Sequence, residues 1–498
     1  MQQETKLARH PDPVPALPGT RLHEFVETAG LIVYALVSCI LFIQRLISQT
    51  DAGVMTAILL CVLVGLSWRN LGSGRHPCFL FLSILTLVQG GRLLAYCLGA
   101  DLNPLRVANL TGAPFDISRE ATGLSLLAVG SAALLVYLPC RWCYRPIDPP
   151  QTGQVKQYLP YLYLLFFLSL PVQAFKNYEY YQVAQATGGY LYYYVNHAAF
   201  ASSVPFLVRL LALAAFPTFI ALFAFETRRR RLWMVACLYF CSSILVLLLG
   251  SRFGTFGLLL ALWYAAGVKS GRKSRLLWAL GLGIVLLVGA EVVQLHREDP
   301  DSMQSYTFAP LSFIRVQGNS FDVTQLAIAY RQVFSPYGTS YLWNELQDAF
   351  VPRDASDYVR GRRFADDVTV FLNASVFETG MGTSSSYIAE CYVIGGMIGV
   401  LVVSLLVGFG LHVLYRASGT SAGLFIVVMM LPDVIAMPRG QLLDWPSVLL
   451  RSFLYIGVLW MGWQVYRCIA WLKNAPRLAM VVPVSTQQDD RLSPDANQ

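Results

Sequence analysis

Charged residues are scarce in this chain of 498 residues. Only 13% of the residues are Asp, Glu, Lys or Arg and 55% are hydrophobic, whereas an average soluble domain is about 25% charged. Several stretches of about 20 residues are nearly free of charge, which is the length that crosses the hydrocarbon core of a bilayer. This shortage of charge excludes an ordinary soluble domain and predicts an all-α polytopic membrane protein.

The sequence also lacks the cysteine framework of a disulfide-rich protein. Nearly all of its ten cysteines fall in apolar stretches or at their ends, and none lies in the long polar segment 296–386. A disulfide network is therefore not expected. Cys140 and Cys143 form one CxxC without a second pair, which is a weak metal signal, and small membrane hydrophobes are the simpler interpretation. We expect no bound metal and no cofactor.

The net charge of +8 does not indicate nucleic-acid binding, because Lys and Arg of a membrane protein mostly mark its cytoplasmic loops. Basic residues, including the run Arg228–Arg231, gather in alternate short loops and in both tails. This asymmetry predicts cytoplasmic termini. About twelve spans are expected from length and hydropathy, at approximately 29–48, 53–70, 78–98, 123–141, 157–175, 205–225, 232–250, 253–268, 276–295, 387–413, 421–437 and 447–471.

These spans divide the chain into five parts. They are a cytoplasmic tail (1–28), nine spans (29–295), a large outer loop with short helices (296–386), three spans (387–472) and a second cytoplasmic tail (473–498). An outer loop as long as 296–386 is usually functional.

Ionisable residues in and beside the spans gather toward the outer side. Such groups are costly in lipid, so their placement predicts a polar cavity that opens outward. Snorkelling at helix ends is the alternative. It suits Arg92 and Arg209 better than Arg252 and Arg439, because outer arginines beside spans run against the positive-inside bias. The set comprises Arg92, Arg209, Arg252, Glu291, Glu390, Asp433 and Arg451, with Arg297 and Arg439 just beyond span ends.

The long loop has no lysine, although it holds eleven acids and seven arginines. Arginine without lysine points to bidentate recognition of phosphate or carboxylate. Ion pairs with the loop acids are an equal alternative for Arg331 and for the cluster 360–363. For the arginines beside spans, a lipid-linked pyrophosphate fits best, since its tail lies in the bilayer and its phosphates lie at the rim. Nearby Tyr and Trp would stack on sugars or form an interfacial belt.

Short motifs in a fixed order carry a family resemblance. Together they resemble Wzy-type oligosaccharide repeat-unit polymerases of O-antigen and related polysaccharides, such as enterobacterial common antigen. The resemblance covers the chain from about residue 160 onward, and its motifs are moderately specific only as an ordered set. They are GSR (Gly250–Arg252), HRED (His296–Asp299), YTF (Tyr306–Phe308) with Arg315, VPR (Val351–Arg353), the segment Ser384–Gly399, and PRG (Pro438–Gly440) with Arg451.

The resemblance implies a GT-C-like fold and metal-independent glycosyl transfer on the periplasmic face of the bacterial inner membrane. The donor would be a growing glycan on undecaprenyl pyrophosphate. The acceptor would be the non-reducing-end sugar of an incoming lipid-linked repeat unit. A Wzx-type flippase and a chain-length regulator would be partners, and nucleic acid would not.

This chemistry suits the arginines, because preorganised cations stabilise a pyrophosphate leaving group. We expect catalytic roles for Arg252, Arg297, Arg315, Arg439, Arg451, Glu298 and Asp322. Substrate contacts are expected from Arg252, Arg353, Arg439, Arg209, Glu390 and Tyr306. The acceptor hydroxyl also calls for a general base, with His296, Glu298, Asp299, Asp322, Glu378, Glu390 and Asp433 as candidates. Glu390 and Asp433 would alternatively pair with arginines. Asp366–Asp367 is expected to be a solvated loop pair.

Two other classes stay open on the sequence. An O-antigen ligase shares the donor and the face, and His296 would suit it. A secondary transporter or a lipid-linked oligosaccharide flippase is the non-enzymatic alternative. Transporters usually show paired halves and broken helices at the bilayer midplane, whereas this sequence shows no internal symmetry and its charges lie outward.

Overall fold

Helices make up all the regular structure that the computed structural model describes. The described residues are 28–34, 37, 46–99, 117–150, 155–187, 204–248, 252–271, 281, 283, 285, 288, 289, 310–350, 358–378 and 382–474, and no strand occurs among them. Seven of their helices are long and apolar enough to cross a membrane. A helix satisfies its backbone hydrogen bonds internally, as is required in lipid, which offers no hydrogen-bond partners. The prediction of an all-α polytopic membrane protein is confirmed.

Ten helices lie where spans are expected. The expected spans 29–48 and 276–295 fall largely outside the described residues. The ten are α2 (Gln49–Asn70), α3 (Pro77–Cys97), α4 (Arg119–Trp142), α5 (Leu159–Thr187), α8 (Phe206–Phe225), α9 (Arg229–Leu248), α10 (Arg252–Ser270), α17 (Tyr387–Ala417), α18 (Ser421–Ala436) and α19 (Trp445–Asn474).

Local sequence explains where several of these helices begin. The Ser48 hydroxyl accepts from the backbone N–H of Asp51, whose side chain reaches back, so a capping box opens α2. His76 caps α3, which has proline at its first position. Ser118 caps α4 and Thr420 caps α18 in the same manner.

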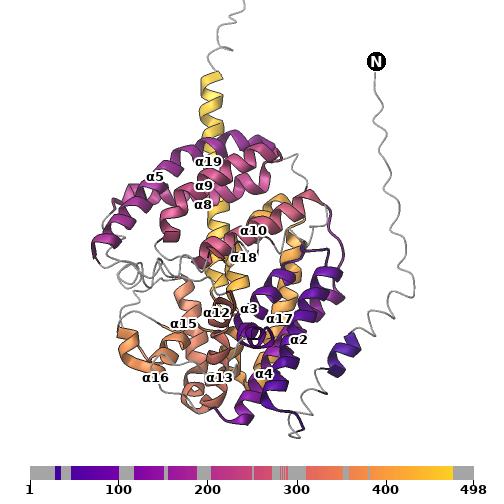
Figure 1. Cartoon of the computed structure of the whole chain (residues 1–498). Helices are drawn as coiled ribbons and strands as arrows, with labels where there is room; N and C mark the ends of the chain where they lie inside the picture. Colours follow the sequence, from indigo (N-terminus) through magenta and orange to yellow (C-terminus); the bar gives the residue numbers. More distant parts are fainter. Residues whose placement is uncertain are drawn as a thin grey trace, which may run out of the picture. The chain divides into compact units, whose positions relative to one another are not determined.

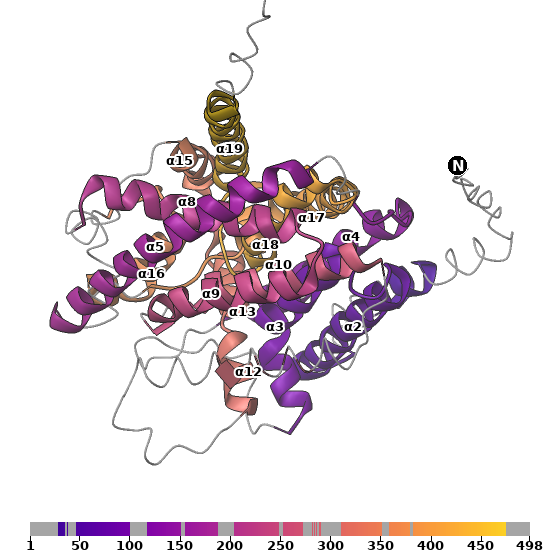
Figure 2. The ribbon, with the colours of Figure 1, turned by 90° about the horizontal axis from the view of Figure 1, so that it is seen from above.

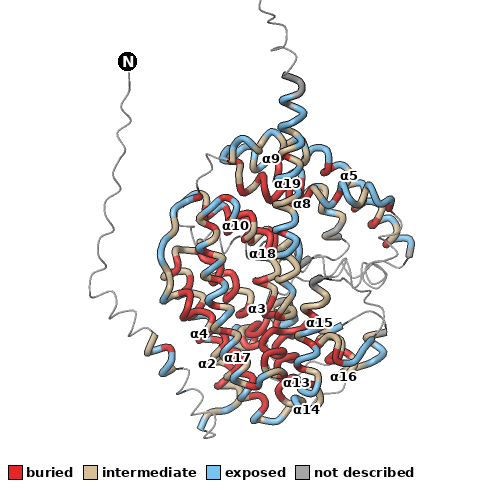
Figure 3. Tube along the Cα trace, turned by 180° about the vertical axis from the view of Figure 1, so that it is seen from behind, coloured by how far each residue is buried: buried red, intermediate tan, exposed pale blue. Residues whose placement is uncertain are grey.

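The best-buried part of the chain lies where α3, α4 and α17 pack together with α2 (Figure 3). Small residues let α4 and α17 approach closely, since a Cβ on Gly408 would lie 2.6 Å from the carbonyl oxygen of Val136. The long helix α17 breaks at Gly396, whose φ is +61°. That left-handed backbone conformation favours glycine.

The segment expected as an outer loop contains shorter helices (Figure 1). One of them, α13, is not a surface element, because every residue from Ser320 to Ile328 is buried. It packs against α3, α4 and α17. The others are α12 (Pro310–Gln317), α14 (Arg331–Phe334), the 3-10 turn η3 (Ser335–Tyr337), α15 (Gly338–Phe350) and α16 (Phe364–Glu378).

The remaining helices pack in two sets. Helix α5 packs against α8 and α9, and α10 packs against α18. The Tyr264 hydroxyl of α10 lies 2.8 Å from the Ser418 hydroxyl, just before α18. The chain divides into two compact units within α19, between Ser452 and Phe453. In the second unit the helix continues to Asn474, with Trp463 stacked on Tyr466.

Candidate active site

Four segments meet at one end of α3 and form what we call the polar junction. They are the residues Gln89–Arg92 of α3, Gln317–Thr324 between and within α12 and α13, Ser385–Glu390 at the start of α17, and Met437–Leu443 after α18. Figure 2 shows α12 beside α3. Segments about 350 residues apart in the chain are thereby joined, as in the hydrogen bond from Gln89 to Pro438.

The buried amide of Gln89 in α3 joins its own segment to the other three. Gln89 donates from Nε2 to the Ser386 hydroxyl at 2.9 Å and to the carbonyl oxygen of Pro438 at 2.9 Å. Its Oε1 accepts from the Thr324 hydroxyl at 3.2 Å. The backbone N–H of Tyr387 also donates to the carbonyl oxygen of Met437 at 3.1 Å. A buried polar network with its partners in place fixes one arrangement of the chain.

An ion pair joins α3 to α13 beside this amide. The guanidinium of Arg92 donates to the carboxylate of Asp322, and both side chains are buried. Two glycines permit the contact. A Cβ on Gly318 would lie 2.4 Å from the backbone nitrogen of Arg92, and one on Gly91 would lie 2.5 Å from the carbonyl oxygen of Ile314. Arg92 therefore does not snorkel to water but pairs with Asp322 inside the protein.

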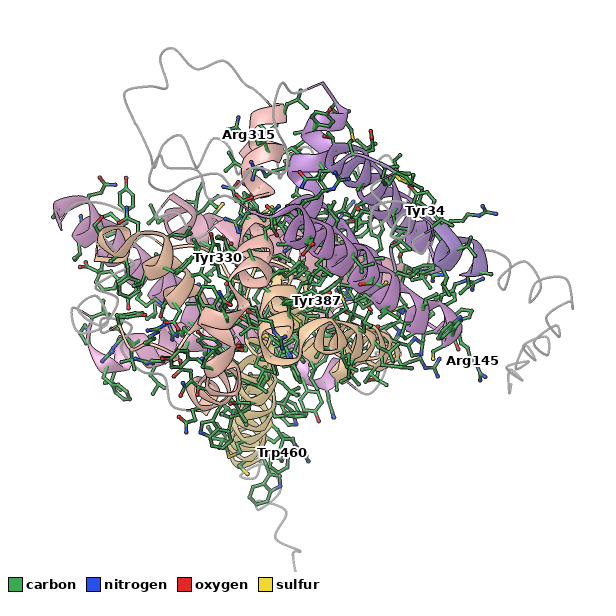
Figure 4. The ribbon with its side chains drawn as sticks, turned by 90° about the horizontal axis from the view of Figure 1, so that it is seen from below. Tyr34, Arg145, Arg315, Tyr330, Tyr387 and Trp460 are labelled. Atoms are coloured by element: carbon green, nitrogen blue, oxygen red, sulfur yellow. The ribbon has the colours of Figure 1, made fainter. Side chains whose placement is uncertain are left out.

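Arginines also lie on the rim of the junction. Arg439 is half-buried and donates to Oε1 of Gln317 at 2.5 Å. Arg315 is exposed on α12, two residues before Gln317. Figure 4 shows Arg315 at the edge of that view and Tyr387 among the packed helices. The structure therefore places Arg439 against Gln317 at the end of α12, the helix that carries Arg315, although the two segments are more than 100 residues apart in the chain.

Two carboxyl groups bind the backbone of the segment that follows Arg439. Glu390 accepts from the Ser385 hydroxyl and, at 2.8 Å, from the backbone N–H of Leu442. Glu345 of α15 accepts from the backbone N–H of Leu443 at 3.2 Å. Burial, together with the charges of Glu390 and Asp444, raises the pKa of Glu345 to about 10. Glu345 therefore holds its proton at neutral pH, close to the charge of Glu390.

Sequence reasoning missed Glu345, because it lies in a loop with many acids and no motif. It also left open the possibility that Glu390 pairs with an arginine. In the structure, a hydroxyl and a backbone amide donate to Glu390 instead. Asp433 fits the arginine alternative better, since Arg451 on α19 is close enough to act on its carboxylate electrostatically.

Arg252 is the first residue of α10. The Tyr264–Ser418 contact fixes the far end of α10 to the start of α18, and the two helices pack along each other. The Arg252 end of α10 therefore lies toward the end of α18 from which Arg439 follows. Its side chain lies outside what the structure describes.

Two other predicted arginines lie on helices outside the four junction segments. Arg209 of α8 has a buried Nε and lies close to Tyr180 of α5. Arg451 is exposed. Six predicted residues fall outside the described part of the chain, and so does Glu291: they are His296, Arg297, Glu298, Asp299, Tyr306 and Arg353. Glu378 ends α16, and its side chain is likewise not described.

The arginines of the loop helices have local partners. Arg363 and Arg362 lie 3.1 Å and 3.9 Å from Asp348, so the ion-pair interpretation holds for both. Arg360 lies over the ring of Tyr337, and Arg331 over that of Tyr392.

The expectation of a solvated pair at Asp366–Asp367 is wrong for Asp367. It is buried and accepts from the Tyr341 hydroxyl at 2.6 Å and from the backbone N–H of Gly361 at 2.9 Å. Gly361 has a φ of +80°, so this carboxylate fixes the tight turn before α16.

Comparison with known families decides the class of the protein. The model of the family described as O-antigen polysaccharide polymerase Wzy matches residues 30–467. The chain belongs to the O-antigen polysaccharide polymerase Wzy family. No curated protein and no solved structure matches it.

The family match extends the resemblance found in the sequence. It begins well before residue 160 and takes in α2, α3 and α4, which hold Gln89 and Arg92 of the junction. Wzy proteins act on lipid-linked oligosaccharide repeat units, so this is a multi-pass membrane enzyme of the glycosyltransferase kind. The ligase and transporter alternatives give way to an O-antigen polymerase.

Proposed function

We propose that the enzyme transfers a growing glycan from undecaprenyl pyrophosphate to the non-reducing-end sugar of an incoming lipid-linked repeat unit. The transfer takes place at the periplasmic face of the inner membrane, with both termini in the cytoplasm. A Wzx-type flippase supplies the repeat unit, and a chain-length regulator limits the product. Family membership supports the substrate class, and the charge asymmetry of the loops supports the orientation.

In this reaction the acceptor hydroxyl attacks the anomeric carbon of the donor sugar. The bond between that carbon and the phosphate oxygen breaks, and undecaprenyl pyrophosphate leaves with the bonding electrons. Negative charge therefore grows on the leaving oxygen. Arg439 and Arg315 lie on the junction rim, where fixed cations would stabilise that charge without a metal. The acceptor's proton passes to a base or to water.

The single observation that carries this site is the bond between Arg439 and Gln317. It fixes the PRG segment to the end of α12, so that Arg439 is held in place at the end of the helix that carries exposed Arg315. Preorganised donors stabilise developing charge better than mobile ones, because they need no reorganisation during the reaction. We include Arg252 because its end of α10 lies toward the same side.

We assign positioning roles to the buried carboxylates. Asp322 is paired with Arg92 and holds α13 against α3. Glu390 holds the 438–444 segment through Leu442 and so positions Arg439. Arg297, Glu298, Tyr306, Arg353, Arg209 and Arg451 stay proposed contacts to the substrate on the sequence alone.

Complementation of a deletion strain tests the proposal, with the surface polysaccharide resolved by size. Arg439→Ala and Arg315→Ala should leave single repeat units in place of long chains, while the variant proteins reach the membrane in normal amounts. Arg360→Ala is the matched control, because Arg360 is also an exposed arginine of the loop segment but lies over Tyr337. It should restore the full ladder.

Normal chain length with Arg439→Ala would remove that arginine from the site. Long polymer that accumulates on the lipid carrier in the deletion strain would show a ligase. An unchanged ladder in the deletion strain would show that another protein makes this polymer.

A further inference from the structure

A second cluster lies at the opposite end of the same helices. His76 caps α3, Cys78 is its second residue, and Cys140 lies near the end of α4. One possible ligand atom from each residue lies within 4.8 Å of the other two. All three side chains are fully buried. We call this set the His–Cys cluster.

The His76 imidazole has one nitrogen in use. Its Nδ1 accepts from the backbone N–H of Cys78 at 3.2 Å. Its Nε2 is buried and has no hydrogen-bond partner among the described residues. In a neutral imidazole whose Nδ1 accepts a hydrogen bond, Nε2 carries the ring proton.

A second histidine from α17 lies beside the cluster. The ring of His412 is stacked on that of His76, with centroids 5.9 Å apart and planes at 22°. Its Nδ1 is also buried and lacks a hydrogen-bond partner in the part of the chain that the structure describes. Buried polar atoms in native proteins nearly always have a partner, so two such nitrogens on adjacent rings call for an explanation.

We propose that His76, Cys78 and Cys140 bind a zinc ion, with His412 as the fourth ligand. Two sulfurs and two imidazole nitrogens are a common zinc ligand set, whereas calcium and magnesium require oxygen. Binding displaces one proton from each thiol, and the two thiolates balance the charge of Zn²⁺. For Nε2 of His76 to bind the ion, the ring proton moves from Nε2 to Nδ1, and the hydrogen bond from the Cys78 N–H to Nδ1 is lost. The complex is thus neutral, as a site buried among apolar side chains demands.

The three residues of the His–Cys cluster need little movement to bind an ion, whereas His412 must move farther, because its ring centroid lies 5.9 Å from that of His76. Zinc–sulfur bonds are about 2.3 Å and zinc–nitrogen bonds about 2.0 Å, so ligand atoms around a tetrahedral ion lie roughly 3.5–4 Å apart. The three ligand atoms already lie within 4.8 Å, and small rotations of side chains would close the difference. The alternative for the two cysteines is a disulfide, but that bond would leave both imidazole nitrogens without a partner.

The ion would have a structural role. It would join the ends of α3, α4 and α17, and the opposite parts of α3 and α17 belong to the polar junction. Fourteen residues of α3 separate Cys78 from Arg92, which is about 20 Å along a helix. The ion would therefore lie far from the arginines and would act by holding the three helices in register.

The first test is the metal content of the full-length protein, purified in detergent without chelator. We expect about one zinc per chain, with Cys78→Ser and Cys140→Ser reducing it at least tenfold and His412→Ala weakening it less. Cys143→Ser and Cys391→Ser are the matched controls. Cys143 belongs to the CxxC but not to the His–Cys cluster, and Cys391 is a buried cysteine of α17. Both should keep the full content.

A second measurement needs only the wild-type protein, in case a variant does not fold. Cobalt(II) added to the chelator-treated protein should give the intense near-ultraviolet band of thiolate coordination, and zinc should remove it. Zinc should also protect Cys78 and Cys140 from alkylation. Absence of the band, or an intact Cys78–Cys140 disulfide in the purified protein, would overturn the proposal.

Discussion

The two ends of α3 and α17 differ in chemistry although the same helices contribute to both. One end holds Gln89, Arg92 and Glu390, with Asp322 and Arg439 from other segments. The other holds His76, Cys78, Cys140 and His412. Fixed charges and amides suit an anionic substrate, whereas neutral imidazoles and thiols suit a soft cation. The helices between them carry mostly apolar side chains, so each end is free to specialise.

The largest effect should come from breaking the ion pair at the junction. Asp322→Ala leaves the Arg92 guanidinium buried without its carboxylate, which typically costs about 3–5 kcal/mol. We expect a strong loss of thermal stability in detergent. Arg92→Met combined with Asp322→Leu should recover most of it, because an apolar pair replaces the buried charges. Wild-type stability in Asp322→Ala would show that the pair holds nothing together.

A glycine at the other end should matter less. Gly408→Ala places a methyl 2.6 Å from the carbonyl oxygen of Val136, whereas a Cβ on Gly410 meets no atom within 4 Å. Overpacking of this kind costs about 1–3 kcal/mol, so Gly408→Ala should lower the melting temperature. Gly410→Ala should leave it unchanged or raise it, because alanine favours helix. Equal melting temperatures would mean that α4 and α17 do not pack this closely.

The proton on Glu345 gives the junction end a dependence on pH. The folded-state pKa of Glu345 is about 10 against an ordinary value of 4.5, so the folded protein binds the extra proton between these values. Stability should fall as pH rises through this window. Glu345→Gln keeps a neutral donor beside Glu390 and should flatten the melting temperature between pH 6 and 9. A slope as steep as that of the wild type would place the titration elsewhere.

The smallest effect is expected among the loop helices. Arg363→Ala removes one of two arginines near Asp348, and Arg362 stays within 3.9 Å. Partly exposed ion pairs contribute about 1 kcal/mol or less. We expect a melting temperature within a degree or two of wild type and normal polymer length. A large loss of polymer would move the anion site toward these arginines.

Composition was enough to predict the membrane-helix class, and periodic charge-free stretches located ten helices. The order of short motifs led to the family. In the structure two of these motifs, PRG and the small-residue start of α17, both contact Gln89. Burial of α13 could not be predicted, because its sequence has a loop-like share of polar residues. Their hydrogen bonds form only when Gln89 and Arg92 are brought to them by the fold.

The cysteines also show that contacts between distant segments could not be predicted from the sequence. Sequence proximity paired Cys140 with Cys143, whereas the structure places Cys140 beside Cys78 and His76 from another helix. Glu345 was missed for the same reason, because nothing near it in the chain signals Glu390. Contacts between distant segments decided both sites, and one sequence carries no direct record of them.

The most direct test of the arginine site is polymerisation by the purified enzyme from lipid-linked repeat units, measured as undecaprenyl pyrophosphate released for each linkage formed. Arg439→Lys keeps the charge but loses the planar guanidinium, of which one nitrogen donates to Gln317 and which we propose to bind a phosphate. We predict at least a tenfold loss of rate with Arg439→Lys, a larger loss with Arg439→Ala, and wild-type rate with Arg360→Ala. Equal rates for wild type and Arg439→Ala would contradict a role for the polar junction in glycosyl transfer.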